Sequence, residues 1–219
     1  MRLDAVARFL QDVAGDDTAD AALPDTGGWI LRRMELDIAR LPKLGAWVDT
    51  RTRCTGVGRG WAERSTTLGL VDPHGDRPAI TARAVWVYVD LASGAPHALP
   101  PEFFAVYGDG VRDHRVSARL ALGRPSPDAA RTEWHWRATD IDVYAHVNNA
   151  SYWAPAEEWL ATAGQGRRIV RAVVEFGAGM DRTERCELRT VAAGDSVTTW
   201  CCVGDEVRAA YHLGLEPIT

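Results

Sequence analysis

The most informative stretch of the chain reads Asp140-Ile141-Asp142-Val143-Tyr144-Ala145-His146-Val147-Asn148-Asn149-Ala150-Ser151-Tyr152-Trp153. Two aspartates, a histidine and two asparagines lie here between a strand-like run at 132–138 and a helix-like run at 152–163. A loop that enters a helix N-terminus places free backbone N–H groups and a positive dipole end beside these side chains. Such a place can polarise a carbonyl group while a carboxylate and an imidazole handle water and protons.

The same order of elements occurs twice along the chain. Apolar residues recur at helical spacing over 3–14, with an expected helix end at Gly15, and strand-like runs follow. A second helix and a second set of runs follow the stretch quoted above. The first set spans 29–39, 46–54, 60–71 and 80–91, and the second spans 169–176, 185–191, 196–203 and 206–213. This repetition predicts an α+β fold of two tandem domains, each a long helix wrapped by a curved antiparallel sheet.

A segment rich in proline and glycine, at 93–110, separates the two repeats. It carries three aromatic residues, so we expect a linker that packs onto a surface. We therefore place an N-terminal domain at 1–110, linker included, and a C-terminal domain at 111–219 that opens with a short strand at 116–122. The first repeat begins almost directly with its helix, which predicts that it lacks an opening strand or that the natural chain begins upstream.

The composition is that of an ordinary globular protein. The 219 residues are 46% hydrophobic and 25% charged, and the net charge of −5 argues against a nucleic-acid partner. The four cysteines lack C-x-x-C spacing, so we expect reduced, buried thiols and no metal site. The sequence has no secretory signal and no apolar run long enough to span a bilayer, which predicts a cytoplasmic protein outside the membrane. The nine tryptophans are expected to pack in the core or to line a broad apolar cavity.

The pattern D-x-D-x-x-x-H-V-N-N-x-x-Y, from Asp140 to Tyr152, resembles the motif at the helix entry of hotdog-fold thioesterases. It resembles most closely the motif of the acyl-acyl-carrier-protein (acyl-ACP) thioesterase family. Four segments of the first half resemble the same family, at 3–12, 29–34, 61–64 and 84–87. The resemblance implies two tandem hotdog domains and hydrolysis of an acyl thioester to a free acid. It implies a substrate carried by acyl carrier protein or coenzyme A, and no cofactor, since the pantetheine belongs to the substrate.

In the plant members of that family the motif reads D-x-N-x-H, and its three polar residues have active-site roles. Asp142 and His146 match this pattern, whereas Tyr144 stands where those members have asparagine. Those members also use a glutamate shortly after a strand, a position that falls here near Gly179 or Met180. Two of the family's four polar positions are therefore changed, and the resemblance carries over Asp142 and His146.

Asp142 and His146 each have two candidate roles. Asp142 is either a turn or capping aspartate, or a carboxylate that activates water or attacks the thioester carbonyl. His146 is either a loop histidine with a local partner, or a donor to the thioester oxygen and a proton carrier near neutral pH. Asp140 is expected to be structural, because it points elsewhere in an extended segment.

Five further residues are candidates around this pair. Tyr144 is expected to form an apolar wall of the acyl pocket, or to donate in place of the missing amide. Asn148 and Asn149 are good N-caps, and the backbone N–H groups from Asn149 to Ser151 are candidate oxyanion-hole donors. Glu158, on the following helix, is either an acid or a solvated charge.

Together these residues predict a thioester hydrolase whose first domain supplies the acyl pocket and whose second domain supplies Asp142, His146 and the helix N-terminus. The expected partner is an acyl carrier protein or coenzyme A thioester, and a homodimer is left open. One alternative is a non-catalytic protein that binds acyl-pantetheine or docks the carrier. The other is a hotdog dehydratase, although the sequence has no H-x-x-x-G-x-x-x-x-P pattern.

Overall fold

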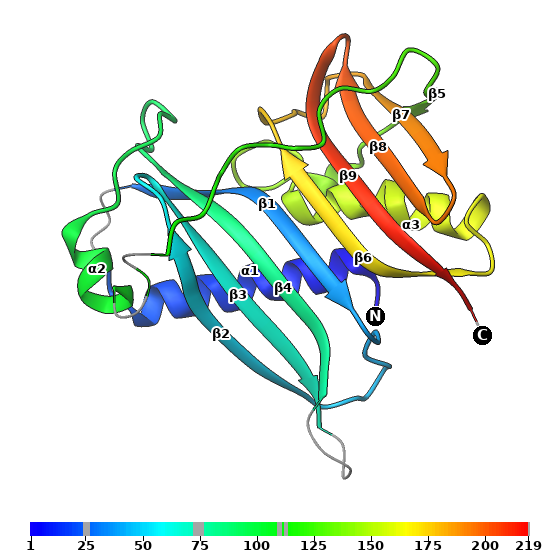
Figure 1. Cartoon of the computed structure of the whole chain (residues 1–219). Helices are drawn as coiled ribbons and strands as arrows, with labels where there is room; N and C mark the ends of the chain where they lie inside the picture. The colour runs from blue at the N-terminus through cyan, green and yellow to red at the C-terminus, as the bar shows by residue number, and fades with distance from the viewer. Residues whose placement is uncertain (24–26, 72–76, 109–110, 112–113, 219) are drawn as a thin grey trace. The chain divides into compact units, whose positions relative to one another are not determined.

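The computed structural model describes residues 1–23, 27–71, 77–108, 111 and 114–218, and Figure 1 shows the path of the chain. The chain divides into two compact units. The N-terminal unit is Phe9–Arg119, and the C-terminal unit is Leu120–Thr219 together with Met1–Arg8. We propose these units as the physical counterparts of the two domains expected from the sequence.

The N-terminal unit contains a four-stranded antiparallel sheet with strand order β2-β3-β4-β1. Its strands are β1 (Gly28–Ile38), β2 (Val48–Val57), β3 (Trp61–Leu70) and β4 (Arg77–Val89). Leu36 on β1 and Ile80 on β4 lie near the same end of the β1–β4 ladder, and both are fully buried. Burial of such side chains on one face of the sheet is what holds the unit together.

Helix α1 (Leu3–Asp20) continues past the glycine at which we expected it to end. Its buried face, which includes Leu3, Val6 and Leu10, has the predicted helical spacing. The expectation of a helix end at Gly15 is wrong. A glycine inside a helix costs roughly 1 kcal/mol but does not terminate it, and the last turn is held here by side chains such as Asp17, which pairs with Arg64 of β3.

The linker expected at 93–110 contains a short helix, α2 (Pro101–Tyr107), that begins with proline at a position where proline suits a helix start. Phe103 of this helix is buried and packs with Tyr88 and Leu99. The ring centroids of Trp29 and Phe103 are 5.8 Å apart. The expectation that this segment packs onto a surface is confirmed for the residues that the structure describes.

The C-terminal unit repeats the pattern with a five-stranded antiparallel sheet in the order β6-β9-β8-β7-β5. Its strands are β5 (Ala130–Trp134), β6 (Arg167–Phe176), β7 (Cys186–Ala193), β8 (Ser196–Val203) and β9 (Glu206–Pro217). Two 3₁₀ turns, η1 (Ala138–Asp140) and η2 (Asn149–Trp153), and the helix α3 (Ala154–Thr162) lie between β5 and β6. An α+β fold in which a helix is followed by four antiparallel strands, twice, is therefore confirmed.

Two local expectations in the C-terminal unit are wrong. The helix after the motif begins at Ala154, with a 3₁₀ turn in the place of its first residues, and it is shorter than expected. No strand forms within 116–122, all of whose residues the structure describes. The backbone N–H groups of Ala121 and Leu122 donate instead to the buried carboxylate of Glu175 on β6. A side chain from a distant strand thus takes the place of a strand partner.

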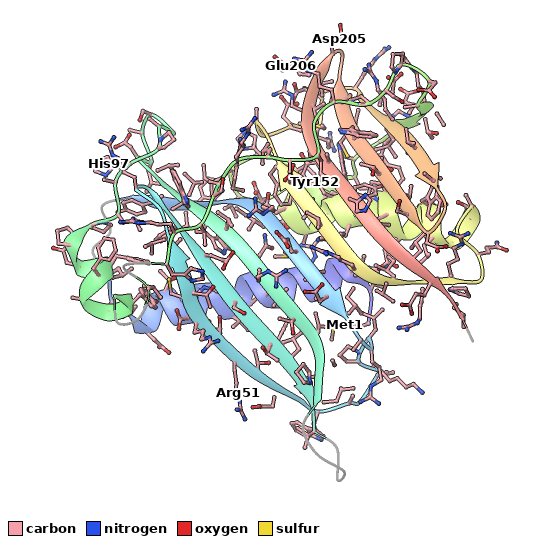
Figure 2. All side chains as sticks on the ribbon, in the orientation of Figure 1. Met1, Arg51, His97, Tyr152, Asp205 and Glu206 are labelled. Carbon is pink, nitrogen blue, oxygen red and sulfur yellow. The ribbon has the colours of Figure 1, made fainter. Side chains whose placement is uncertain are left out.

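Aromatic side chains pack in a row in the C-terminal unit. Tyr152, labelled in Figure 2, is buried between Trp136 and Phe176, with ring centroids 5.1 and 5.5 Å away. The indole N–H of Trp136 donates to the sulfur of Met180. This row ties the 3₁₀ turn η2 to the chain that leaves β6, and both segments carry candidate site residues.

Candidate functional site

The motif loop, residues 141–148, is a closed turn built around Asp142. Oxygen Oδ1 of Asp142 accepts hydrogen bonds from the backbone N–H groups of Tyr144 and His146, with N–O distances of 2.9 and 3.2 Å. The Asp142 N–H donates to the carbonyl oxygen of His146 over 2.8 Å. Ala145, between them, has a φ of 62°, a conformation that residues other than glycine rarely adopt. The loop-shaping role that we considered for Asp142 is thus present, and Oδ2 has no hydrogen bond among the described residues.

His146 lies over the chain that follows β6. A Cβ on Gly179 would come within 3.1 Å of the imidazole, so a larger residue at this position would require the ring to shift by a few tenths of an ångström. The adjacent Val147 N–H donates to the carbonyl oxygen of Met180 over 2.7 Å. This backbone bond fixes the motif loop beside Met180 and the next residue, Asp181.

Asp181 is a candidate residue that the sequence analysis missed. The hydroxyl and backbone N–H of Thr183 donate to its carboxylate and hold the pKa of Asp181 below its ordinary value, with a smaller contribution from the nearby charge of His146. The resemblance to the family predicts an acidic residue near Gly179 or Met180, and Asp181 is the next residue along the chain. A carboxylate therefore lies in the electrostatic range of the His146 imidazole.

The segment that carries Asp181 is anchored from β9. The Asp181 N–H donates to Glu184, and Glu184 forms an ion pair with Arg208 at 2.7 Å. Arg208 also donates to the carbonyl oxygen of Gly179 over 3.2 Å. Both side chains of the ion pair are largely buried, so this support is shielded from solvent.

Asn148 and Ser151 form hydrogen bonds with backbone groups at the start of the next turn. Asn148 is the N-cap of η2, and its Oδ1 accepts from the Ala150 N–H over 2.9 Å. The Ser151 N–H donates to the Asn148 carbonyl oxygen, and its buried hydroxyl donates to the carbonyl oxygen of Asp140. Two of the three amides expected to form an oxyanion hole are thus already occupied. In the part of the chain that the structure describes, the Asn149 N–H alone of these three donates no hydrogen bond.

Tyr144 and Glu158 point to solvent rather than toward the loop's polar groups. Tyr144 is 72% exposed, and Glu158 is also exposed. The neighbouring Glu157 accepts from the backbone N–H of Leu3 at the start of α1. No hydrogen bond or ion pair among the described residues joins the Tyr144 or Glu158 side chain to Asp142 or His146.

Asp140 has the structural role that we expected. It is buried, and its carboxylate accepts from the backbone and guanidinium of Arg137. Burial alone would raise the pKa of Asp140, but the hydrogen bonds and charge of Arg137 outweigh it and lower the pKa overall. This pair fixes the chain immediately before the motif loop.

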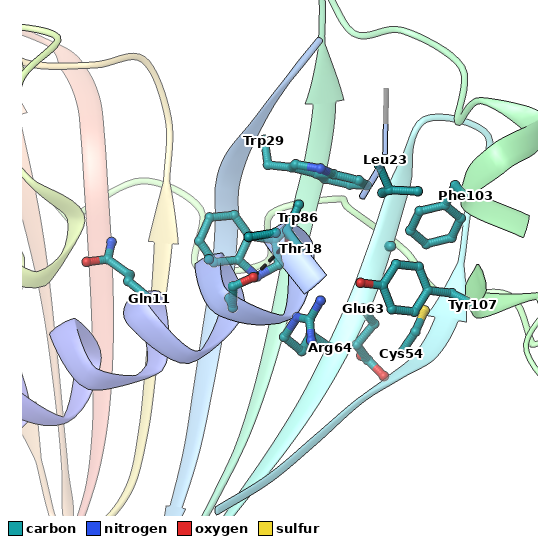
Figure 3. A pocket seen from close by; sticks show the side chains of 14 residues that line it. Gln11, Thr18, Leu23, Trp29, Cys54, Glu63, Arg64, Trp86, Phe103 and Tyr107 are labelled. Carbon is teal, nitrogen blue, oxygen red and sulfur yellow. Dashed lines mark hydrogen bonds between the residues drawn. The ribbon is translucent and has the colours of Figure 1, made fainter. Parts of the chain in front are cut away.

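The N-terminal unit contains a cavity of about 520 Å³, within the range typical of small-molecule sites. Figure 3 shows Trp29, Trp86, Leu23 and Phe103 among the side chains that line it. Gly15 of α1 also lines the cavity, and a Cβ there would contact nothing within 4 Å. Two of the nine tryptophans thus line an apolar cavity, while others, such as Trp153, pack in the core.

One corner of this cavity is charged. Arg64 and Tyr107 line it together with Glu63, whose carboxylate accepts from the Thr55 hydroxyl on the neighbouring strand β2. Arg64 forms an ion pair with Asp17 at 2.7 Å, and the Tyr107 hydroxyl donates to the same carboxylate oxygen over 2.7 Å. Burial, and then the hydrogen bond to Asp17, raise the pKa of Tyr107 to about 12. We refer to Asp17, Arg64 and Tyr107 as the polar cluster.

Metal-binding and membrane-spanning features are not found in the described ranges. No three His, Cys, Asp or Glu side chains gather there as ligands for a metal ion. None of the helices in those ranges combines the length and the apolar character needed to cross a bilayer.

Known proteins resemble the chain over most of its length. Residues 1–107 match the model of the acyl-ACP thioesterase N-terminal domain, and residues 124–195 match that of the C-terminal domain. An uncharacterised protein of Mycobacterium tuberculosis is 31% identical over 214 residues, which are 97% of this chain and 84% of that protein.

Two solved structures share the fold. The 12:0-ACP thioesterase of Umbellularia californica has 18% identity and a TM-score of 0.79, with 100% of this chain and 91% of that chain covered. An acyl-ACP thioesterase of Bacteroides thetaiotaomicron VPI-5482 has 18% identity and a TM-score of 0.81, with 99% and 90% covered. At this identity the likeness shows the architecture, which is the tandem hotdog fold.

Proposed function

Because the chain belongs to the acyl-ACP thioesterase family, whose activity is thioester hydrolysis, we propose that its motif loop hydrolyses an acyl thioester of acyl carrier protein or coenzyme A. The observation that carries this assignment is the pair formed by Asp142 and His146 on one closed turn. Hydrogen bonds within the turn hold the backbone that carries both side chains, which supports a defined geometry for catalysis.

Asp142 and His146 divide the proton transfers between them in this proposal. Oδ1 of Asp142 shapes the loop, and the free Oδ2 takes a proton from water as the water oxygen bonds to the thioester carbon. Alternatively, the Asp142 carboxylate attacks the thioester carbon itself. This attack forms an anhydride, which water then hydrolyses. As the carbon–sulfur bond breaks, His146 gives a proton to the departing sulfur, and the products are the acid and the thiol.

Two further groups complete the proposed site. Asp181 stabilises the charge of His146 when the imidazole is protonated, because opposite charges in close range favour each other. The unoccupied Asn149 N–H is the proposed donor to the carbonyl oxygen, at the start of η2. Tyr144, exposed on the same loop, is proposed to contact the carrier or the substrate outside the reacting centre. Glu158 keeps the role of a solvated charge.

The cavity of the N-terminal unit is the proposed acyl site. Its walls are mainly apolar, and aromatic and small aliphatic side chains such as Trp29 and Ala62 can cover a hydrocarbon chain. The proposed substrate class is therefore an acyl chain attached through a thioester to a pantetheine carrier.

A free-thiol assay with a panel of acyl-CoA and acyl-ACP substrates tests the proposal, with Asp142→Asn as the first variant. Asparagine keeps Oδ1 as a hydrogen-bond acceptor, so the turn is retained while the base is lost. We expect kcat/KM to fall by about 10² to 10⁴, the usual contribution of a general base. Asp205→Asn is the control, because this aspartate lies on a turn with its side chain fully exposed.

Near wild-type turnover by Asp142→Asn would refute the assignment of the base. A folded wild-type protein that binds the acyl substrates but releases no thiol from any of them would support the alternative of a non-catalytic acyl-pantetheine-binding protein. Formation of an enoyl product from a hydroxyacyl substrate would instead support a dehydratase.

A further inference from the structure

Bulky apolar side chains face solvent at one end of the N-terminal sheet. Leu44, in the turn between β1 and β2, is fully exposed, and Trp47, at the end of that turn, is 83% exposed. Val71, directly after β3, is 61% exposed, and its backbone N–H donates to the carbonyl oxygen of Trp47 over 3.2 Å. We refer to Leu44, Trp47 and Val71 as the apolar tip. Single exposed apolar residues are ordinary, whereas neighbouring ones indicate an interaction site.

The backbone of the turn keeps Leu44 outside the core. The Ala46 N–H donates to the carbonyl oxygen of Lys43 over 3.1 Å, and Gly45 has a φ of 81°, which glycine adopts without strain. Leu44 and Gly45 are therefore the two central residues of a tight turn, where polar residues and glycine are the usual choice. The apolar side chain of Leu44 is thus available to a partner outside the chain.

Basic side chains lie beside the apolar tip. Arg40 and Lys43 precede Leu44, and both are exposed. Neither forms an ion pair with a carboxylate of the residues that the structure describes. Residues 37–53 contain four basic and two acidic side chains, a net charge of +2 in a chain whose net charge is −5. The apolar tip therefore lies beside a local excess of positive charge.

This combination fits the surface of a bilayer better than the surface of a protein. Tryptophan prefers the membrane–water interface, where its ring has apolar surroundings and its N–H has polar ones. Arginine and lysine beside it can reach lipid phosphates, and each strengthens binding when the lipids are anionic. Protein–protein interfaces, by contrast, are depleted in lysine. Binding at the surface requires no segment that crosses the bilayer.

We propose that the apolar tip inserts into the headgroup region of a bilayer that contains anionic phospholipids, with Arg40 and Lys43 in contact with the lipid phosphates. Three side chains and two charges give reversible binding, since stable anchoring needs a larger apolar area. This inference goes beyond the proposed hydrolysis and depends on neither the motif loop nor the cavity.

Co-sedimentation of the full-length protein with vesicles tests the proposal. One set of vesicles is phosphatidylcholine alone, and the other contains equal parts of phosphatidylcholine and phosphatidylglycerol. We expect the wild type to bind the anionic vesicles about tenfold more tightly than the neutral ones, because two cations contribute. High salt should reduce this difference, because it screens exposed charges.

Leu44→Ser combined with Trp47→Ser removes most of the apolar contact. We expect this double variant to bind anionic vesicles about tenfold more weakly than the wild type, since apolar burial is lost. Lys43→Glu should lower the preference for anionic lipid and leave the apolar contact in place. Leu91→Ser is the matched control and should bind as the wild type does, because Leu91 is 61% exposed and follows the end of β4 that lies away from Val71.

Absence of wild-type binding to both kinds of vesicle would overturn the inference, as would binding that the double variant retains. Self-association of the wild type that the double variant abolishes, measured by sedimentation velocity and found without vesicle binding, would assign the apolar tip to a second copy of this chain and overturn the lipid proposal. Circular dichroism checks that the variants fold, and the wild-type comparison of the two vesicles decides if one does not. No thiol release is measured, so failure of this inference is distinguishable from failure of the proposed hydrolysis.

Discussion

At the scale of single residues, the candidate site depends on backbone hydrogen bonds as much as on its side chains. Asp142 accepts from two amides of its own loop, and Val147 fixes the loop to Met180. These bonds bring His146 within electrostatic range of Asp181, although the two are far apart in sequence. The proposed supporting charge of Asp181 thus depends on how two loops are tied together, whereas the proposed acid and base lie on one loop.

Asp181→Asn tests the contribution of this carboxylate. The change removes the negative charge near His146 but keeps an oxygen that can accept from Thr183. We expect kcat in the thiol assay to fall by about tenfold, with little change in KM. Asp181→Glu, which restores the charge, should recover part of the activity. A kcat unaffected by Asp181→Asn would remove this residue from the site.

At the scale of secondary-structure elements, α1 has two tasks. Its first turns bury Leu3 and Val6, and its last turns supply Asp17 to the polar cluster and Gly15 to the cavity wall. A glycine in the middle of a helix lowers the free energy of unfolding, because it increases the conformational freedom of the unfolded chain. In the cavity wall, glycine leaves more free space than any larger residue would.

Gly15→Ala is expected to stabilise the protein. A Cβ at this position meets nothing within 4 Å, so the helix gains about 0.4–1 kcal/mol and Tm rises by about 1–4 °C. Gly164→Ala is the contrasting variant, because its Cβ would lie 2.6 Å from the ring of Trp159 and should destabilise the protein. Thermal unfolding followed by circular dichroism measures both. Destabilisation by Gly15→Ala would show that the position is not open.

At the scale of the whole molecule, buried titratable groups link folding stability to pH. The pKa of His212 is lowered, mainly by burial and to a smaller extent by the charge of Arg171. A hydrogen bond joins Nδ1 of its ring to the Thr198 hydroxyl. The unfolded chain therefore binds a proton at higher pH than the folded protein does. The pKa of Asp140 is also lowered in the folded state, by its hydrogen bonds to Arg137. At acidic pH the unfolded chain therefore binds a proton at Asp140 more readily than the folded protein does.

The free energy of unfolding should therefore fall as the pH drops below 6.5, the ordinary pKa of histidine, and fall again below the ordinary pKa of Asp140, 3.8. His212→Gln should remove part of the first decline and leave the second. Urea unfolding between pH 7 and pH 3, on the wild type and this variant, measures the two slopes. An identical first decline in both proteins would exclude His212 as its source.

Much of the architecture could be predicted from local patterns. The helical spacing of Leu3, Val6 and Leu10 and the Gly-Asp turns at 194–195 and 204–205 specify their elements, because each depends on neighbours a few residues away. The motif itself identified Asp142 and His146, and its resemblance to a family indicated the tandem fold.

Other features required the folded chain. Asp181 beside His146, Glu175 on the amides of Ala121 and Leu122, and the polar cluster all join residues that lie far apart in sequence. A sequence pattern reports which face of an element is apolar, whereas these contacts depend on which elements become neighbours and in what register. Local periodicity therefore determined the elements and their order, and tertiary packing decided which charged groups meet.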